Sequence, residues 1–162
     1  MQKIIPNLWF DDQAEEAAAF YVSLFRNAKV GTVMHYDKES ANVSGKPEGS
    51  VLTVAFTLEG QDFVALNGGP QFKFSEAVSF QVDCKTQEEV DRFWNKLTAD
   101  GGEESVCGWL KDKYGLSWQI VPTVLNEMLQ DENPIRAQRV MKAMLQMKKI
   151  DIAGLQEAYG RD

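Results

Sequence analysis

The chain contains one pattern twice, as EEAAAFYVSL at residues 15–24 and as EEVDRFWNKL at residues 88–97. Both stretches read Glu-Glu-x-x-x-Phe-aromatic-x-x-Leu, and the second follows the first by 73 residues (88 − 15 = 73). The spacing of the apolar residues predicts an amphipathic helix in each stretch, with the adjacent aromatic pair on the face that packs against a sheet. The glutamates suit the unsatisfied N–H groups of a first helical turn. The repetition therefore predicts two copies of one structural module.

The segments around these helices complete the module. Residues 3–10 predict a strand, and Asp12 is the expected N-cap of the first helix. Three β-rich segments follow, KVGTVMHY, SVLTVAFTLEG and QDFVALNGG, with the polar stretch DKESANVSGKPEG (37–49) expected to be a loop. The order restarts with the strand AVSFQVDC and a helix capped by Thr86, and EESVCGWLKD and GLSWQIVP supply the remaining strands. We predict an α+β fold in which two tandem βαβββ modules, 3–69 and 76–122, form a curved mixed sheet.

The remainder of the chain, residues 123–162, has a helical pattern. TVLNEMLQDE, NPIRAQRVMKAMLQMKK and DIAGLQEAY predict three helices, the second with Asn133 as N-cap and Pro134 at its first position. The second helix carries an apolar stripe of Val140, Met141, Met144 and Leu145. Such a stripe can dock on the protein's own sheet or on a sister subunit, and its methionines would also suit a partner helix. Because 162 residues are enough for one good core, we expect modules and tail to form a single domain, 1–162.

Composition excludes several classes of partner. The net charge of −7 and the pI of about 4.8 disfavour nucleic acid, because the field of the molecule repels phosphate. The sequence has no long apolar run for a bilayer, and its N-terminal MQKIIPNLWFDDQ lacks the patterns of signal and transit peptides. We therefore expect a cytoplasmic protein with no membrane partner. The two cysteines, Cys84 and Cys107, are expected to be reduced and mostly structural.

Four segments carry a resemblance to a known family: LWFDDQAEEAAAFYVSLF, GGPQFKFSEAVSF, GWLKDKYGLSWQIVPTVL and RVMKAMLQMKKIDIAGLQEAY. They look like the PhnB-like family, often labelled 3-demethylubiquinone-9 3-methyltransferase, of the glyoxalase/bleomycin-resistance/extradiol dioxygenase (vicinal oxygen chelate) superfamily. The resemblance implies the tandem βαβββ fold and a homodimer. The label also implies a site for S-adenosylmethionine, usually built on a Gly-rich strand–helix turn. Neither Gly68-Gly69 nor Gly101-Gly102 is followed by such a unit.

For metal-using members, the resemblance implies four ligands, one on the first and one on the last strand of each module. These positions fall on Ile5, Ala77, Gln119 and a residue near 63–65. A divalent cation needs oxygen or nitrogen donors, so at most one weak ligand remains, Gln119. The single histidine, His35, is expected to be a structural or surface residue. We expect neither a metal site nor a cofactor.

What remains is a polar concave face. If Ile5, Ala77 and Gln119 mark this face, the two-residue period of strands adds neighbours to it, and the candidate ligand-binding residues are Asn7, Trp9, Ser79, Gln81, Ser117 and Gln119. Amides, hydroxyls and an indole suit a small organic ligand better than acid–base catalysis, and no catalytic residue is assigned. The sequence leaves Trp109 and Trp118 open between core and rim. It also leaves three lysines open between solvated surface and attraction of an anionic ligand: Lys73, Lys111 and Lys113.

Three functions remain open from the sequence. The favoured one is a small-molecule-binding protein without the superfamily metal site. The alternatives are an enzyme of the superfamily (an isomerase, lyase, dioxygenase or the labelled methyltransferase) and an interaction module that uses the Met-rich tail. A homodimer is expected on physical grounds too, because three short helices cover the edges and concave face of an open sheet only in part. In that dimer the loop 37–49 would close over the polar concave face or reach the neighbouring subunit.

Overall fold

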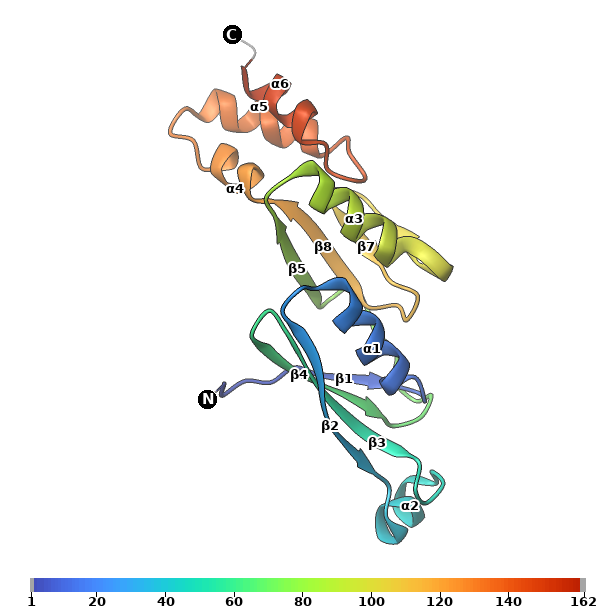
Figure 1. Cartoon of the computed structure of the whole chain (residues 1–162). Coiled ribbons are helices and arrows are strands. Elements are labelled where there is room, and N and C mark those ends of the chain that lie inside the picture. Colours follow the sequence, from blue (N-terminus) through green and yellow to red (C-terminus); the bar gives the residue numbers. More distant parts are fainter. Residues whose placement is uncertain (1, 161–162) are drawn as a thin grey trace. The chain divides into compact units, whose positions relative to one another are not determined.

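The computed structural model of the protein describes residues 2–160, which form two compact units, one up to Lys73 and one from Phe74 onward (Figure 1). Each unit contains a four-stranded mixed sheet and a helix that packs on it. Because the two sheets repeat one strand order, the predicted tandem βαβββ architecture is confirmed. None of the helices within residues 2–160 has the length and apolar content needed to cross a bilayer.

The first unit runs β1 (Asn7–Phe10), α1 (Ala14–Leu24), β2 (Ala28–His35), α2 (Lys38–Ser44), β3 (Val51–Leu58) and β4 (Gln61–Asn67). The sheet order is β1-β4-β3-β2, with β1 parallel to β4 and the other pairs antiparallel. Alternate residues of the strands, among them Phe10, Phe56 and Ala65, are buried with Tyr21 and Leu24 of α1. Tyr21 stacks on Phe56 at 6.1 Å between ring centroids, so the second aromatic residue of the pair in α1 faces the sheet as predicted, whereas Phe20 is half-buried.

The second unit begins with β5 (Ser79–Cys84), α3 (Gln87–Thr98), a short 3-10 turn (Ala99–Gly101), β6 (Glu103–Glu104), β7 (Trp109–Lys111) and β8 (Ser117–Pro122). Its order, β5-β8-β7-β6, repeats that of the first sheet, with β5 parallel to β8. The predicted strand EESVCGWLKD is divided into β6 and β7 by a turn in which Cys107 and Gly108 have positive φ. Phe93 and Trp94 of α3 are buried.

The start of α1 differs from the prediction. Asp12 does not cap the helix, and Gln13 at the N-cap position makes no side-chain capping bond. The buried amide of Asn67, at the end of β4, takes this role, because its Oδ1 accepts a hydrogen bond from the N–H of Ala14 at 2.8 Å. A side chain 53 residues away thus satisfies one of the unpaired donors of the first turn.

The polar stretch 37–49 is also a correction, because it contains helix α2 rather than only loop. Asp37 and Ser40 form a capping box, in which the Asp37 side chain accepts a hydrogen bond from the Ser40 N–H at 2.8 Å. The Ser40 hydroxyl also donates to the Asp37 carboxylate at 2.6 Å, and this bond together with the one from the Ser40 N–H holds the pKa of Asp37 below its ordinary value. Gly45 ends the helix at φ 73°, a conformation that glycine adopts without strain.

The tail forms three helices, as predicted: α4 (Thr123–Leu129), α5 (Pro134–Met144) and α6 (Ile152–Gly160). They share one apolar cluster with the end of β8, made of Val121, Leu125, Met128, Val140, Ile150 and Leu155. The predicted stripe of α5 is divided between two environments. Val140 and Met144 pack into this cluster, whereas Met141 and Leu145 are 40% and 55% exposed.

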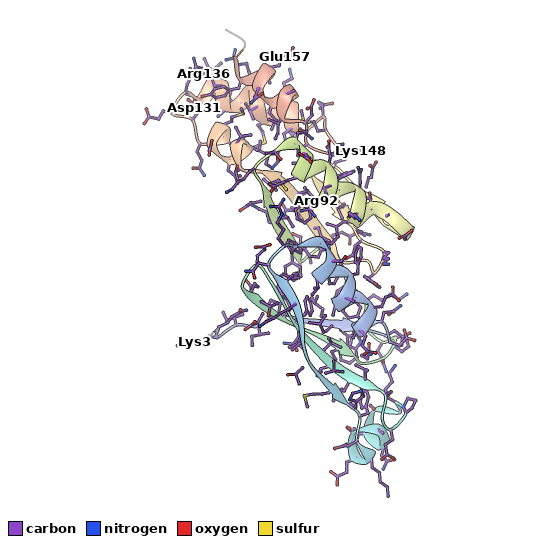
Figure 2. The ribbon with its side chains drawn as sticks, in the orientation of Figure 1. Lys3, Arg92, Asp131, Arg136, Lys148 and Glu157 are labelled. Carbon is purple, nitrogen blue, oxygen red and sulfur yellow. The ribbon has the colours of Figure 1, made fainter. Side chains whose placement is uncertain are left out.

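A polar contact closes the loop between α4 and α5. The Tyr159 hydroxyl of α6 donates a hydrogen bond to Asp131, which is the main reason that the pKa of Asp131 lies below its ordinary value. The guanidinium of Arg136 lies over the Tyr159 ring at 5.5 Å from its centroid. Asp131 and Arg136 are labelled in the tail in Figure 2.

Both cysteines are free, as predicted. Cys84 is buried, and this burial raises the pKa of its thiol to about 12. The thiol of Cys84 is therefore protonated at neutral pH and acts as a small apolar core group.

We predict that Asn67→Leu lowers the free energy of unfolding by about 2–4 kcal/mol, because it leaves the buried Ala14 N–H and Val51 C=O without their partner. Urea unfolding followed by circular dichroism measures this. Asn7→Leu is the matched control, since Asn7 is an exposed amide of the same sheet and its replacement should change stability by less than about 0.5 kcal/mol. Equal effects of the two variants would contradict the capping role of Asn67.

Candidate functional site

The second sheet has an apolar face and a polar face, because side chains alternate along each strand. Leu110, Trp118 and Ile120 point to the face that α3 covers and are buried. The strand register places the alternate residues on the opposite face: Ser79, Gln81, Trp109, Lys111, Ser117 and Gln119. Four of the six predicted site residues therefore share one sheet face within one unit.

The polar side chains of this face differ in whether they have a hydrogen-bond partner. The amide of Gln119 donates to the Ser79 hydroxyl at 2.9 Å, and that of Gln81 donates to Asp83 at 2.7 Å. Ser117 is only 1% exposed, and its Oγ has no hydrogen-bond partner in the described part of the chain. A buried hydroxyl without a partner is costly, so native proteins that keep one usually have a structural or functional reason.

Ser117 also lines a cavity of about 200 Å³. The other lining residues are Glu76, Glu103, Glu104, Ser105, Trp109, Leu110 and Lys111. The cavity thus involves β6, β7 and Ser117 at the start of β8, and Ser79 and Gln119 on the same face are not among its lining residues. Of this set, the sequence assigned only Ser117 to the site and left the roles of Trp109 and Lys111 open. The signal that would have found Trp109 and Lys111 is the two-residue period carried from β8 across the β7–β8 hairpin.

One ion pair stands at this cavity. Lys111 Nζ lies 2.5 Å from Glu76 Oε1, and this contact lowers the pKa of the Glu76 carboxyl and raises the pKa of the Lys111 ammonium. The Lys111 and Glu76 side chains are 35% and 63% exposed, so solvent screens the pair and it contributes little to stability. Both groups remain charged at neutral pH.

The structure shows the environments of Trp109 and Trp118, which the sequence left open between core and rim. Trp118 belongs to the core, 3% exposed, and its Nε1 donates to Asp112 Oδ2 at 2.9 Å. Trp109 is half-buried on the polar face and lines the cavity. Of the three lysines, Lys111 lines the cavity, Lys73 is exposed, and Lys113 lies over the Tyr114 ring.

The remaining predicted site residues, Asn7 and Trp9, belong to the first unit, where they share the face of β1 that points away from the core. Asn7 is exposed, and its side-chain amide donates to the nearby Ile5 carbonyl at 3.1 Å. Trp9 donates through Nε1 to the Gly69 carbonyl at 2.9 Å and meets the Phe72 ring edge-on. A Cβ on Gly68 would lie 2.2 Å from the Trp9 indole, so this glycine is needed for the close approach of Trp9.

The four superfamily metal positions do not carry a ligand set. The parallel register pairs Trp9 with Leu66 and Gln81 with Gln119, which makes Leu66 the counterpart of Gln119, one residue beyond the predicted 63–65. Ile5, Ala77 and Leu66 have no donor atoms, and the Gln119 amide is bonded to Ser79. His35 is exposed. Within residues 2–160, no group of three or more His, Cys, Asp or Glu side chains is arranged to hold a metal ion.

Comparison with known proteins places this geometry in a family. The model of the family described as 3-demethylubiquinone-9 3-methyltransferase matches residues 2–121. The solved structure of the PhnB protein from Bacillus cereus is 36% identical, covers 75% of this chain and 100% of its own, and has a TM-score of 0.66. The chain belongs to this family. The predicted resemblance is thereby confirmed for the two modules.

More distant structures share the fold. Protein PA1353 from Pseudomonas aeruginosa is 16% identical over 75% of this chain and 98% of its own, with a TM-score of 0.58. The fosfomycin resistance protein FosX from Listeria monocytogenes is 20% identical over 80% of this chain and 98% of its own, with a TM-score of 0.53. No curated protein sequence matches the chain.

Two observations limit what the family match says about this chain: the part of the chain that it covers, and the setting of the glycine pairs. The match covers residues 2–121, so it does not include the tail segment 139–159, whose sequence also resembles the family. The glycine pairs also do not join a strand to a helix: Gly68-Gly69 follows β4 and accommodates Trp9, and Gly101-Gly102 connects α3 to β6. Neither pair forms the turn typical of S-adenosylmethionine sites.

We predict that Zn²⁺, Ni²⁺ and Mn²⁺ leave the thermal unfolding midpoint of the protein unchanged, because a ligand stabilises only a state that it binds. Differential scanning calorimetry after removal of free metal measures this, and elemental analysis should find well under one equivalent. Gln119→Leu is the matched variant. A stoichiometric metal that survives dialysis in the native protein and disappears from Gln119→Leu would show that the ligand positions are wrong.

Proposed function

We propose that this protein binds a small organic molecule on the polar face of the second sheet and does so without the superfamily's divalent metal. The observation that supports this most is the buried Ser117 hydroxyl, which lacks a partner and lines a cavity. The hydrogen-bonded Ser79 and Gln119 side chains lie on the same face and extend it with further donors and acceptors. A cavity with a few convergent polar groups and an aromatic wall is the usual form of a small-molecule site.

Binding fits the charges at the site better than acid–base catalysis does. A general acid or base works best with a pKa near the operating pH. At this site the pKa of Glu76 is lowered and that of Lys111 is raised, so both move away from neutrality. The candidate ligand-binding side chains on this face, Ser79, Gln81, Ser117 and Gln119, are amides and hydroxyls, which do not exchange protons readily near pH 7.

The names of the relatives suggest two more specific activities. The family description names a methyltransferase, but the glycine pairs of this chain lack the strand–helix setting that such a cofactor site usually has. FosX is described as a fosfomycin resistance protein, and fosfomycin is a small molecule. At 20% identity, however, the similarity to FosX shows only a shared fold. Binding of a small molecule is therefore the function we favour, with an enzyme of the superfamily as the alternative.

We also propose that the protein is cytoplasmic and acts as a homodimer. Three apolar side chains, Ile135 and Met141 of α5 and Leu145 directly after it, are 63%, 40% and 55% exposed and would suit a subunit interface. Helix α2, which lies in the stretch 37–49 that the sequence predicted to be a loop, would then present a defined surface to the neighbouring subunit.

We predict that a thermal-shift screen of metabolite-like compounds finds ligands whose affinity falls about tenfold or more in Gln119→Leu and in Ser79→Ala, since both variants break the hydrogen-bonded pair on the polar face. Titration calorimetry measures the affinities. Gln156→Leu, on an exposed position of α6, is the matched control and should bind as the native protein does. Ligands that bind equally to all these variants would place the site elsewhere and refute the proposal.

We predict that sedimentation equilibrium at micromolar concentration gives twice the 18.2 kDa mass of the chain. Met141→Lys with Leu145→Glu should shift the species toward monomer, because charges within an apolar interface are costly. The control pair, Lys142→Glu with Gln146→Lys, changes neighbouring exposed positions of the same segment. A single species at the monomer mass in the native protein would rule out the dimer.

A further inference from the structure

We propose that the cavity at Ser117, Trp109 and Lys111 takes a small organic cation that also carries a hydrogen-bonding group. This inference rests on the proposed binding function and names its class of ligand. It reverses the possibility, left open by the sequence, that Lys111 attracts an anion. Three independent features of the cavity support it: the charge of its lining, the Trp109 indole and the unpaired Ser117 hydroxyl in its lining.

The charge of the lining favours a cation. The side chains of Glu76, Glu103 and Lys111 belong to the cavity on the polar face, so their formal balance is −1, two carboxylates against one ammonium. The Glu104 carboxylate is not counted here, because it accepts a hydrogen bond from Trp94 Nε1 of α3 at 2.7 Å and lies across from Leu110 on the face that α3 covers. Glu103 is the ladder neighbour of Lys111, so the ammonium of Lys111 stands between two acidic positions. An anionic ligand would meet repulsion from the carboxylates of Glu76 and Glu103.

The aromatic wall gives such a cation a second attraction. Trp109 is half-buried on the polar face and lines the cavity together with these carboxylates. The face of an indole attracts ammonium groups, and tryptophan is the best of the aromatic residues for this contact. Carboxylates beside an indole are therefore a suitable environment for a quaternary or alkylated ammonium.

The hydroxyl of Ser117 supplies the polar contact. Lys111 lies directly across from Ser117 in the β7–β8 ladder, so the two side chains leave the same face of the sheet as neighbours. The ammonium of Lys111 is directed to Glu76 instead of Ser117. The ion pair is exposed and weak, so a ligand ammonium can take the place of Nζ at Glu76 and a polar group of the ligand can reach Ser117 Oγ.

Choline is the probe, because it carries a quaternary ammonium and a hydroxyl in a molecule small enough for a cavity of about 200 Å³. Its uncharged carbon analogue, 3,3-dimethylbutan-1-ol, has the same shape, and 3,3-dimethylbutanoate supplies the opposite charge. Titration calorimetry of the full chain at low salt compares the three. We expect choline to bind at least about fivefold more tightly than the alcohol, and the carboxylate to bind most weakly.

Four variants assign the contacts. Glu103→Gln and Trp109→Leu should each weaken choline binding about threefold or more, whereas Lys111→Met should strengthen it by removing the competing ammonium. Ser117→Ala should weaken choline but leave tetramethylammonium, which has no hydroxyl, unchanged. This last variant removes an unpaired hydroxyl, so its thermal midpoint should not fall. Glu88→Gln, an exposed carboxylate of α3, is the control and should bind choline as the native protein does.

The outcomes separate this inference from the proposed function. Tighter binding of the alcohol or the carboxylate, absence of choline binding, or weaker choline binding by Lys111→Met would overturn the cation class. In each of these cases the proposed function still stands if the compound screen yields ligands sensitive to Gln119→Leu. Choline binding that is insensitive to Glu103→Gln, Trp109→Leu and Ser117→Ala would overturn the assignment to this cavity.

Discussion

The parallel pairing of the first strand with the last strand in each module is the constraint on which the structure depends. Parallel neighbours cannot be joined by a tight turn, so the chain must cross a face of the sheet, and the helix of each module makes part of this connection. In both units that helix covers one face and buries the alternate residues that point to it. The opposite face is left for polar residues, and the register of β5 against β8 sets Ser79 beside Ser117 and Gln81 beside Gln119.

The buried polar residues show how this polar face differs from the cores. Asn67, Asp112 and Ser117 are all buried. Asn67 joins three elements by hydrogen bonds, and Asp112 holds the β7–β8 turn by accepting from the N–H groups of Tyr114 and Leu116. Ser117 alone of these three has an unpaired side-chain atom. Hydrogen bonds within the protein thus account for the first two buried polar groups, and the third is the one on which the proposed ligand site rests.

Family membership and local chemistry give different information about this protein. The family match and the shared strand order establish the fold, but a fold supports many functions, and the site residues decide among them. Apolar side chains stand at three of the four superfamily metal positions, while acidic and aromatic residues gather at β6 and β7. The tail helices lie outside the family match and add an apolar cluster at the end of β8.

The sequence by itself determined the two modules and the helices of the tail. It also determined that one sheet face carries Ser79, Gln81, Ser117 and Gln119. Both follow from the periods of helices and strands, which are properties of neighbouring residues. It also contained the capping box of α2, a local signal that the polar composition of 37–49 obscured. Only the tertiary structure decided that Asn67 caps α1, that Gly68 makes room for Trp9, and that Glu76 meets Lys111. These contacts join residues far apart in the chain, so they depend on strand order and register, which local sequence patterns do not specify.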